Sequence, residues 1–153
     1  MPHSKLEDLP SGGDRWPAIG REGFRSTQWG DMEVGLTTVH APLDCTEQYK
    51  FGGLPGGVCP CPHYGYVFEG RLRAQYPGSD WPEEVIEAGE AYFIPSGHVL
   101  IYDEPSRVLE FNPAAALQTC MDAISKAIEK MTAAGIAAAP APAETQGSAD
   151  TSS

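Results

Sequence analysis

The sequence predicts an all-β protein, built as a small barrel or sandwich, with one amphipathic helix towards its C-terminal end. Short runs rich in β-branched and aromatic residues recur between residues 32 and 113, separated by glycines and prolines. No helical pattern lies between these runs, which argues against alternating strands and helices. After residue 113 the apolar residues change to helical spacing.

The first part of the chain is expected to contribute little to the core. Residues 1–25 are rich in Pro, Gly and charge, so we expect an N-terminal arm. The barrel is expected over residues 26–113, and its first strand over residues 32–40. Residues 41–62 are expected to form a loop, because "FGGLPGGVCPCP" contains four glycines and three prolines.

The remaining strands follow one another with short turns between them. Gly70, Pro95, Gly97 and Pro105 mark breaks. The strand-like segments are residues 65–76, 83–89, 91–97, 99–105 and 106–113. Short strands at this spacing are typical of a barrel or a sandwich.

A helix is expected over residues 114–133. Asn112 suits the N-cap and Pro113 the first helical position. One apolar stripe follows, made by Leu117, Met121, Ile124, Ile128 and Met131. We expect this stripe to pack on the barrel or on a second subunit. Residues 134–153 repeat Ala and Pro among small polar residues, and we expect them to be disordered.

Composition limits the possible partners and compartments. The 153 residues suffice for one domain, and ten Lys and Arg against 21 Asp and Glu give a net charge of −11. Such a charge disfavours binding to nucleic acid and to anionic lipid. No apolar stretch approaches the length of a membrane span, and the N-terminal residues show no signal-peptide pattern. We therefore expect a cytoplasmic protein with reduced cysteines.

The segment "GGVCPCPHYGYVFEG" carries the candidate site. Cys59, Cys61 and His63 alternate with prolines, and alternate residues of an extended chain share one face. A disulfide between the two cysteines would close too tight a ring. We expect a metal site in which His63 and His98 are the first candidate ligands, followed by Cys61 and then Cys59. Zinc is the first candidate metal, with iron or copper second. The alternative is that the cysteines line an apolar pocket and the histidines only form hydrogen bonds.

Two longer segments, "PHYGYVFEGRLRAQYPG" and "GEAYFIPSGHVLIYDEP", resemble the two motifs of the cupin superfamily. The second is most similar to that of small single-domain bacterial cupins. The resemblance implies an RmlC-like jelly roll, or double-stranded β-helix, which in many members holds one divalent metal through three histidines and a glutamate. The chain departs from this ligand set. With Gly70 at the family's turn glycine, His63 falls at the glutamate, Cys59 at the second histidine and Gly57 at the first.

The function expected from these features is that of a small metalloenzyme acting on a small organic molecule. Isomerase, lyase, hydrolytic and oxygenase reactions all occur in cupins, so the fold selects none of them. A cysteine ligand favours zinc-centred hydrolysis or isomerisation over dioxygenase chemistry. The alternatives are a non-catalytic cupin that binds or senses a small ligand, and a structural zinc site.

Four further residues are candidates for a substrate pocket: Tyr64, Tyr66, Tyr102 and His40. The tyrosines flank the candidate ligands, although packing with a satisfied hydroxyl is their usual role. His40 ends a strand and could reach the barrel mouth. The helix and the resemblance to cupins also suggest a homodimer.

Overall fold

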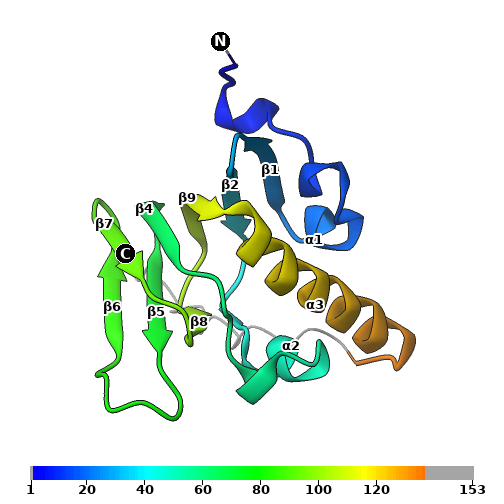
Figure 1. Cartoon of the computed structure of the whole chain (residues 1–153), viewed down its shortest axis with the longest axis vertical. Helices are drawn as coiled ribbons and strands as arrows, with labels where there is room; N and C mark the ends of the chain where they lie inside the picture. Colours follow the sequence, from blue (N-terminus) through cyan, green and yellow to red (C-terminus); the bar gives the residue numbers. More distant parts are fainter. Residues whose placement is uncertain (1, 137–153) are drawn as a thin grey trace, which may run out of the picture.

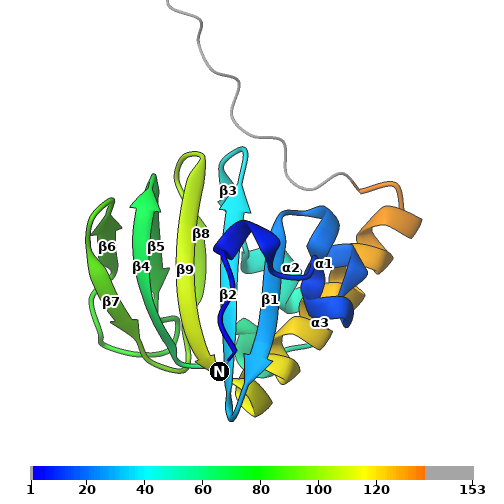
Figure 2. The ribbon, with the colours of Figure 1, turned by 90° about the horizontal axis from the view of Figure 1, so that it is seen from above.

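The computed structural model describes residues 2–136 and contains two antiparallel sheets stacked face to face (Figures 1 and 2). The five-stranded sheet has the order β1 (Phe24–Trp29), β2 (Met32–Val39), β9 (Ser106–Pro113), β4 (His63–Glu69), β7 (Ala91–Ile94). The four-stranded sheet has the order β3 (Leu43–Asp44), β8 (Val99–Tyr102), β5 (Arg71–Gln75), β6 (Glu84–Glu87). The disorder predicted for residues 134–153 lies outside the described residues from 137 onwards.

The core lies between the two sheets. Val67 and Val108 from the larger sheet and Leu72, Ala74 and Leu100 from the smaller one belong to one buried cluster. In β9 every second residue is buried, which places one face of this strand inside. The strands predicted from alternation and turn residues are therefore present, and the sheet-rich class is confirmed.

The sheets do not close into a barrel through strand pairing. Among the described residues, no pairing joins a strand of one sheet to a strand of the other. Of the barrel and the sandwich that the sequence left open, the structure therefore has two stacked sheets, and the barrel expected over residues 26–113 is not closed. β1 extends the larger sheet past the smaller one, and the helices gather along this side of the molecule (Figure 2). On this side, helices rather than hydrogen-bonded strands cover the space between the two sheets.

Three α-helices cover this side: α1 (Pro17–Arg21), α2 (Thr46–Phe51) and α3 (Ala114–Ala133). The bounds of α3 are those predicted, and its stripe is buried at Leu117 and Met131. α2 lies inside the predicted loop 41–62, followed by the 3₁₀ turn η3 (Pro55–Gly57). Within residues 2–136, no helix is long and apolar enough to cross a membrane.

The N-terminal segment packs on the sheet, in contrast to the arm that its composition predicts. Two short 3₁₀ turns, η1 (Leu6–Asp8) and η2 (Gly12–Asp14), precede α1. Leu9, Trp16 and Ile19 are buried. The indole nitrogen of Trp16 donates a hydrogen bond to Asp122 of α3 at 2.8 Å. A few large apolar residues thus anchor a segment that is otherwise rich in Gly and Pro.

Candidate functional site

Cys59 and His98 are brought together by an isolated antiparallel bridge. The amide of Cys59 donates to the carbonyl of His98, and the amide of Gly97 donates to the carbonyl of Cys59, both at 2.8 Å. Gly97 has a φ of 95°, which side-chain-bearing residues rarely adopt. His63 begins β4 and pairs with Ile94. Two distant segments of the chain, residues 59–63 and 94–98, therefore meet here.

Cys59, His63 and His98 form a compact buried group that could hold a metal ion. Their ligand atoms all lie within 4.8 Å of one another. The sulfur of Cys59 is 3.7 Å from Nε2 of His63. The two imidazole rings meet edge to face, with centroids 4.7 Å apart. Buried polar atoms of this kind require a partner, either a protein group or a bound ligand.

The outer nitrogen of each imidazole lies against a carbonyl oxygen. Nδ1 of His63 is 2.7 Å from Oδ1 of Asn112, and Nδ1 of His98 is 2.7 Å from the carbonyl oxygen of Pro95. Because a carbonyl oxygen only accepts, each Nδ1 carries a hydrogen, and Nε2 of the neutral ring keeps a lone pair. Nε2 of His98 is buried and has no hydrogen-bond partner among the described residues. Metal-binding histidines are held in the same way.

The electrostatics of the group favour a thiolate at Cys59. The thiol of Cys120 lies 3.0 Å from the sulfur of Cys59, and its hydrogen bond lowers the pKa of Cys59 to about 3 despite burial. Burial alone would lower the pKa of His63. The Glu110 carboxylate and the hydrogen bonds with Cys59 and Cys61 outweigh it and raise that pKa well above its usual value. A metal ion bound to the Cys59 sulfur would take the place of the proton on the His63 ring nitrogen that faces this sulfur.

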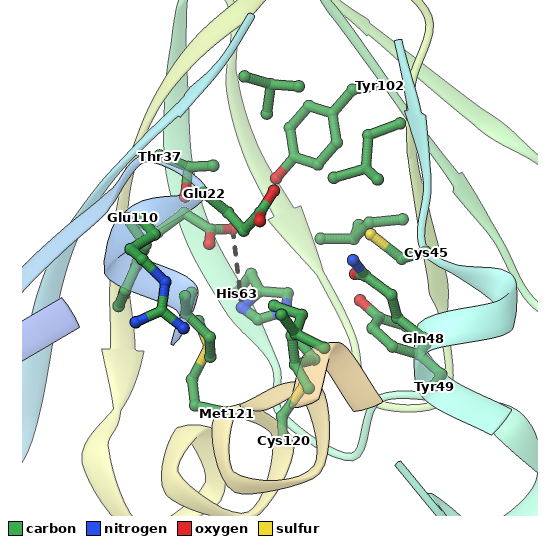
Figure 3. A pocket seen from close by; sticks show the side chains of 18 of the residues that line it. Glu22, Thr37, Cys45, Gln48, Tyr49, His63, Tyr102, Glu110, Cys120 and Met121 are labelled. Atoms are coloured by element: carbon green, nitrogen blue, oxygen red, sulfur yellow. Dashed lines mark ion pairs between the residues drawn. The ribbon is translucent and has the colours of Figure 1, made fainter. Parts of the chain in front are cut away.

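Glu110 places a carboxylate beside this group. Its Oε2 atom is 3.6 Å from Nδ1 of His63 (Figure 3, dashed line) and accepts a hydrogen bond of 2.8 Å from the hydroxyl of Tyr92. Gly65 permits this second contact, because a Cβ at residue 65 would lie 2.5 Å from the Tyr92 hydroxyl. The strand register thus fixes the Glu110 carboxylate on the inner face of β9.

A cavity of about 410 Å³ adjoins the group (Figure 3). Its lining is mainly apolar, and its polar side chains include His63, Glu110 and Tyr102. Exposed lining residues, among them Arg21 and Glu22, mark its opening to solvent. Since His63 lines the cavity and also belongs to the Cys/His group, a small molecule in the cavity would lie next to that group.

Three of the four predicted metal ligands come together in the structure, and the fourth does not. His63, His98 and Cys59 meet, whereas Cys61, which the sequence favours over Cys59, lies outside the group. The thiol of Cys61 faces the carbonyl of Pro62 at 3.2 Å. The chain bends between the bridge at Cys59 and the start of β4, so simple alternation of side chains does not hold there.

The predicted pocket residues divide into two pairs. Tyr102 and His40 line the cavity. Tyr64 and Tyr66 do not, and the sequence assignment of these two to a pocket needs correction. Their side chains are exposed on the outer face of the larger sheet, opposite to that of His63, because they occupy the other parity of β4.

Glu110, Asn112 and Cys120 were not among the predicted site residues. The first two alternate with the buried Val108 along β9 and share its face. This parity was the signal that could have identified them, because polar residues at buried strand positions are unusual. Cys120 is a buried residue of α3, and no local pattern in the sequence pairs it with Cys59.

No protein-family model matches the chain, and no curated protein matches it. Similar solved structures include the EutQ protein of Clostridium difficile, at 17% identity over 60% of this chain and 68% of that one, with a TM-score of 0.39. A cupin-2 domain protein of Shewanella frigidimarina matches at 16% identity over 59% and 78%, with a TM-score of 0.38.

A protein of unknown function from Rhizobium leguminosarum matches at 20% identity over 73% of this chain and 94% of that one, with a TM-score of 0.45. An RmlC-like cupin of Shewanella frigidimarina also matches, at 14% identity over 60% and 75%, with a TM-score of 0.39. Cupins are thus among the solved structures to which this chain is similar.

Proposed function

We propose that the protein binds one divalent transition metal ion through Cys59, His63 and His98. Zinc is the first candidate, because it takes thiolate and imidazole ligands together, and iron or copper comes second. The metal would lie between the two stacked sheets, which we propose to be the halves of a cupin-type jelly roll.

The observation that carries this proposal is the buried Nε2 atom of His98. It has no hydrogen-bond partner among the described residues, and a ring nitrogen of His98 lies within 4.8 Å of the Cys59 sulfur. Leaving such an atom unpaired costs about 1–3 kcal/mol, which a bound metal would recover. The carbonyl oxygens at both Nδ1 atoms support the same assignment, since they orient the rings for binding through Nε2.

We propose further that the metal site serves an enzyme acting on a small organic molecule. Three protein ligands leave one position open, which is the pattern of catalytic rather than structural zinc. A metal in such a site polarises a carbonyl group or activates water. The cavity beside His63 supplies room for a substrate, and the class of reaction remains one of those that cupins perform.

Two alternatives rest on particular contacts. A non-catalytic ligand-binding protein would use the same cavity without turnover. A structural zinc site would need a fourth protein ligand, for which Cys120 is the candidate, because its sulfur lies 3.0 Å from that of Cys59. Cys120 is nevertheless outside the compact group of ligand atoms. This favours the open site.

A thiol nucleophile is a further candidate, because Cys59, His63 and Asn112 follow one another in the order known from cysteine hydrolases. The cavity argues against it. Among the described residues His63 and Cys120 line the cavity, whereas Cys59 does not. A substrate in the cavity would therefore not reach the Cys59 sulfur directly.

We also propose that the protein is a cytoplasmic homodimer. Four free, buried cysteines suit a reducing compartment. Tyr64 is the cross-strand neighbour of both Phe93 and Phe111, and these aromatic residues, with Tyr66, are exposed on the outer face of the larger sheet. Adjacent exposed aromatic side chains are typical of interaction surfaces. The net charge of −11 disfavours nucleic acid as the partner.

Zinc binding tests the proposal. Equilibrium dialysis of the metal-free protein against zinc should give one ion per chain. The His98→Ala variant should lose this binding while its circular dichroism spectrum remains that of the wild type. Equal zinc binding by both proteins would show that His98 is not a ligand and would refute the site.

A further inference from the structure

We propose that the cavity binds an uncharged, mainly apolar molecule with a hydroxyl group, an alcohol or a phenol, which donates a hydrogen bond to Glu110 and accepts one from Tyr102. The inference rests on the proposed function in that the ligand hydroxyl would lie beside the metal site. The evidence for the ligand comes from the cavity, which exists whether or not a metal is bound.

The size and lining of the cavity select for a mainly apolar ligand. Its volume of about 410 Å³ is well above the roughly 150 Å³ of a cavity that holds benzene, so a two-ring molecule has room. The apolar walls include Phe24, Leu43, Leu100, Leu117 and Ile124. Burying apolar ligand surface against such walls supplies the main part of the binding free energy.

Glu110 offers one oxygen atom to this ligand. Its Oε2 atom already accepts the hydrogen bond from Tyr92, whereas no described residue donates to Oε1. The Glu110 side chain is only 6% exposed and points into the cavity (Figure 3). Oε1 is not among the buried atoms without a partner, so it is open to the cavity, where a ligand hydroxyl can donate to it.

Tyr102 provides the complementary donor. Burial, and after it the Glu110 carboxylate, raises the pKa of Tyr102 well above its usual value, so the phenol keeps its proton. Figure 3 shows its hydroxyl on the same side of the cavity as Glu110. A hydroxyl group both donates and accepts, and it therefore suits a position between a carboxylate and a phenol.

The charges around the cavity disfavour an anionic ligand. A carboxylate in the cavity would lie near Glu110, and like charges repel strongly where water is scarce. Arg21 and Glu22 are adjacent, exposed and opposite in charge at the opening, so they offset each other. In the metal-free protein, Arg21 at the opening is the one Lys or Arg among the described lining residues, so the interior of the cavity offers no fixed cation to a ligand carboxylate.

Binding of 2-naphthol, naphthalene and 2-naphthoate, three probes with the same ring system, tests this inference. Equilibrium dialysis should show that metal-free wild-type protein binds 2-naphthol at least about tenfold more tightly than either of the others, the effect of one hydrogen bond to a charged group. In Glu110→Gln the preference over 2-naphthoate should shrink to within about threefold, because the amide carries no charge and can donate to a carboxylate.

Glu129→Gln is the matched control, since it removes the same charge from an exposed position of α3 outside the cavity and should leave the preference unchanged. Thermal melts verify that both variants fold. Equal or tighter binding of 2-naphthoate by the metal-free wild type, or no binding of any probe, would overturn the inference.

The measurements are repeated on metal-free and zinc-loaded wild type. A naphthol preference without zinc binding would refute only the metal site, and zinc binding without the preference would refute only this inference.

Discussion

Cys59 and Cys61 show how strongly the role of a residue depends on its immediate contacts. Both thiols are completely buried and only two positions apart. The sulfur of Cys59 faces His63 and Cys120, whereas that of Cys61 faces the carbonyl of Pro62. The pKa of Cys59 is lowered to about 3 with the hydrogen bond from Cys120 as the main cause, while burial raises the pKa of Cys61. Cys59 therefore has the environment of a metal-binding thiolate, whereas at Cys61 burial outweighs the hydrogen bond with His63.

The pair therefore gives a matched test of the ligand set. Cys59→Ser should weaken zinc binding by more than about 100-fold, since removing an outer partner of a ligand already costs about 10–100-fold. Cys61→Ser should change it by less than about threefold. Competition with a chromophoric chelator measures both affinities. A larger loss of zinc affinity in Cys61→Ser than in Cys59→Ser would show that Cys61 is the ligand, as the sequence suggests, and would contradict the site.

The sequence was sufficient to identify His63, His98 and Cys59 as candidates, because residue type and proximity to strand turns are local features. It could not rank the two cysteines, since the bend between Cys59 and β4 is not visible in the alternation. Glu110 was missed for a different reason. Its importance depends on the register of β9 against β4 and on the reach of Tyr92 across Gly65, and both are long-range features.

Among the secondary-structure elements, those with a regular pattern were predictable. The strands from β4 to β9 and the helix α3 follow from alternation, turn residues and an apolar stripe. β1, α1 and α2 were missed, because Gly- and Pro-rich surroundings conceal the few large apolar residues that hold them. Burial of Trp16 or Tyr49 results from packing against α3 and the sheets, which no local pattern encodes.

Trp16 and Trp81 test the contribution of the N-terminal segment. Trp16 is 3% exposed and bonded to Asp122, whereas Trp81 is 57% exposed. Trp16→Ala should lower the free energy of unfolding by about 3–5 kcal/mol, the usual cost of removing a buried aromatic side chain. Trp81→Ala should lower it by less than about 1 kcal/mol. Urea unfolding followed by circular dichroism measures both. Equal effects would mean that the segment does not contribute to the core.

In the molecule as a whole, the cavity is formed partly by helices that the sequence did not predict. Its walls include residues of α1, α2 and α3 together with both sheets. Because the first two helices were expected to be arm and loop, a cavity of this kind could not be predicted. The two-sheet architecture was predictable, and its closure by helices instead of strand pairing was not.

The proposed homodimer is also a property of the whole molecule. Phe93 is 52% exposed in the aromatic patch of the larger sheet, and Val85 is 41% exposed on β6 of the smaller sheet. If the patch forms the interface, Phe93→Asp should convert the dimer to a monomer in sedimentation velocity experiments, because it buries an unpaired charge. Val85→Asp should remain dimeric. A monomeric wild-type protein would contradict the proposal, as would dissociation caused by Val85→Asp alone.

X-ray absorption spectroscopy of the zinc-loaded protein tests the metal site most directly, because it counts the ligand atoms around the ion. We expect one sulfur at about 2.3 Å from Cys59, and nitrogen or oxygen neighbours at about 2.0–2.1 Å that include two imidazoles. The sulfur should disappear in Cys59→Ser and remain in Cys61→Ser. A shell of oxygen atoms alone, or a sulfur signal that persists in Cys59→Ser, would contradict the site formed by Cys59, His63 and His98.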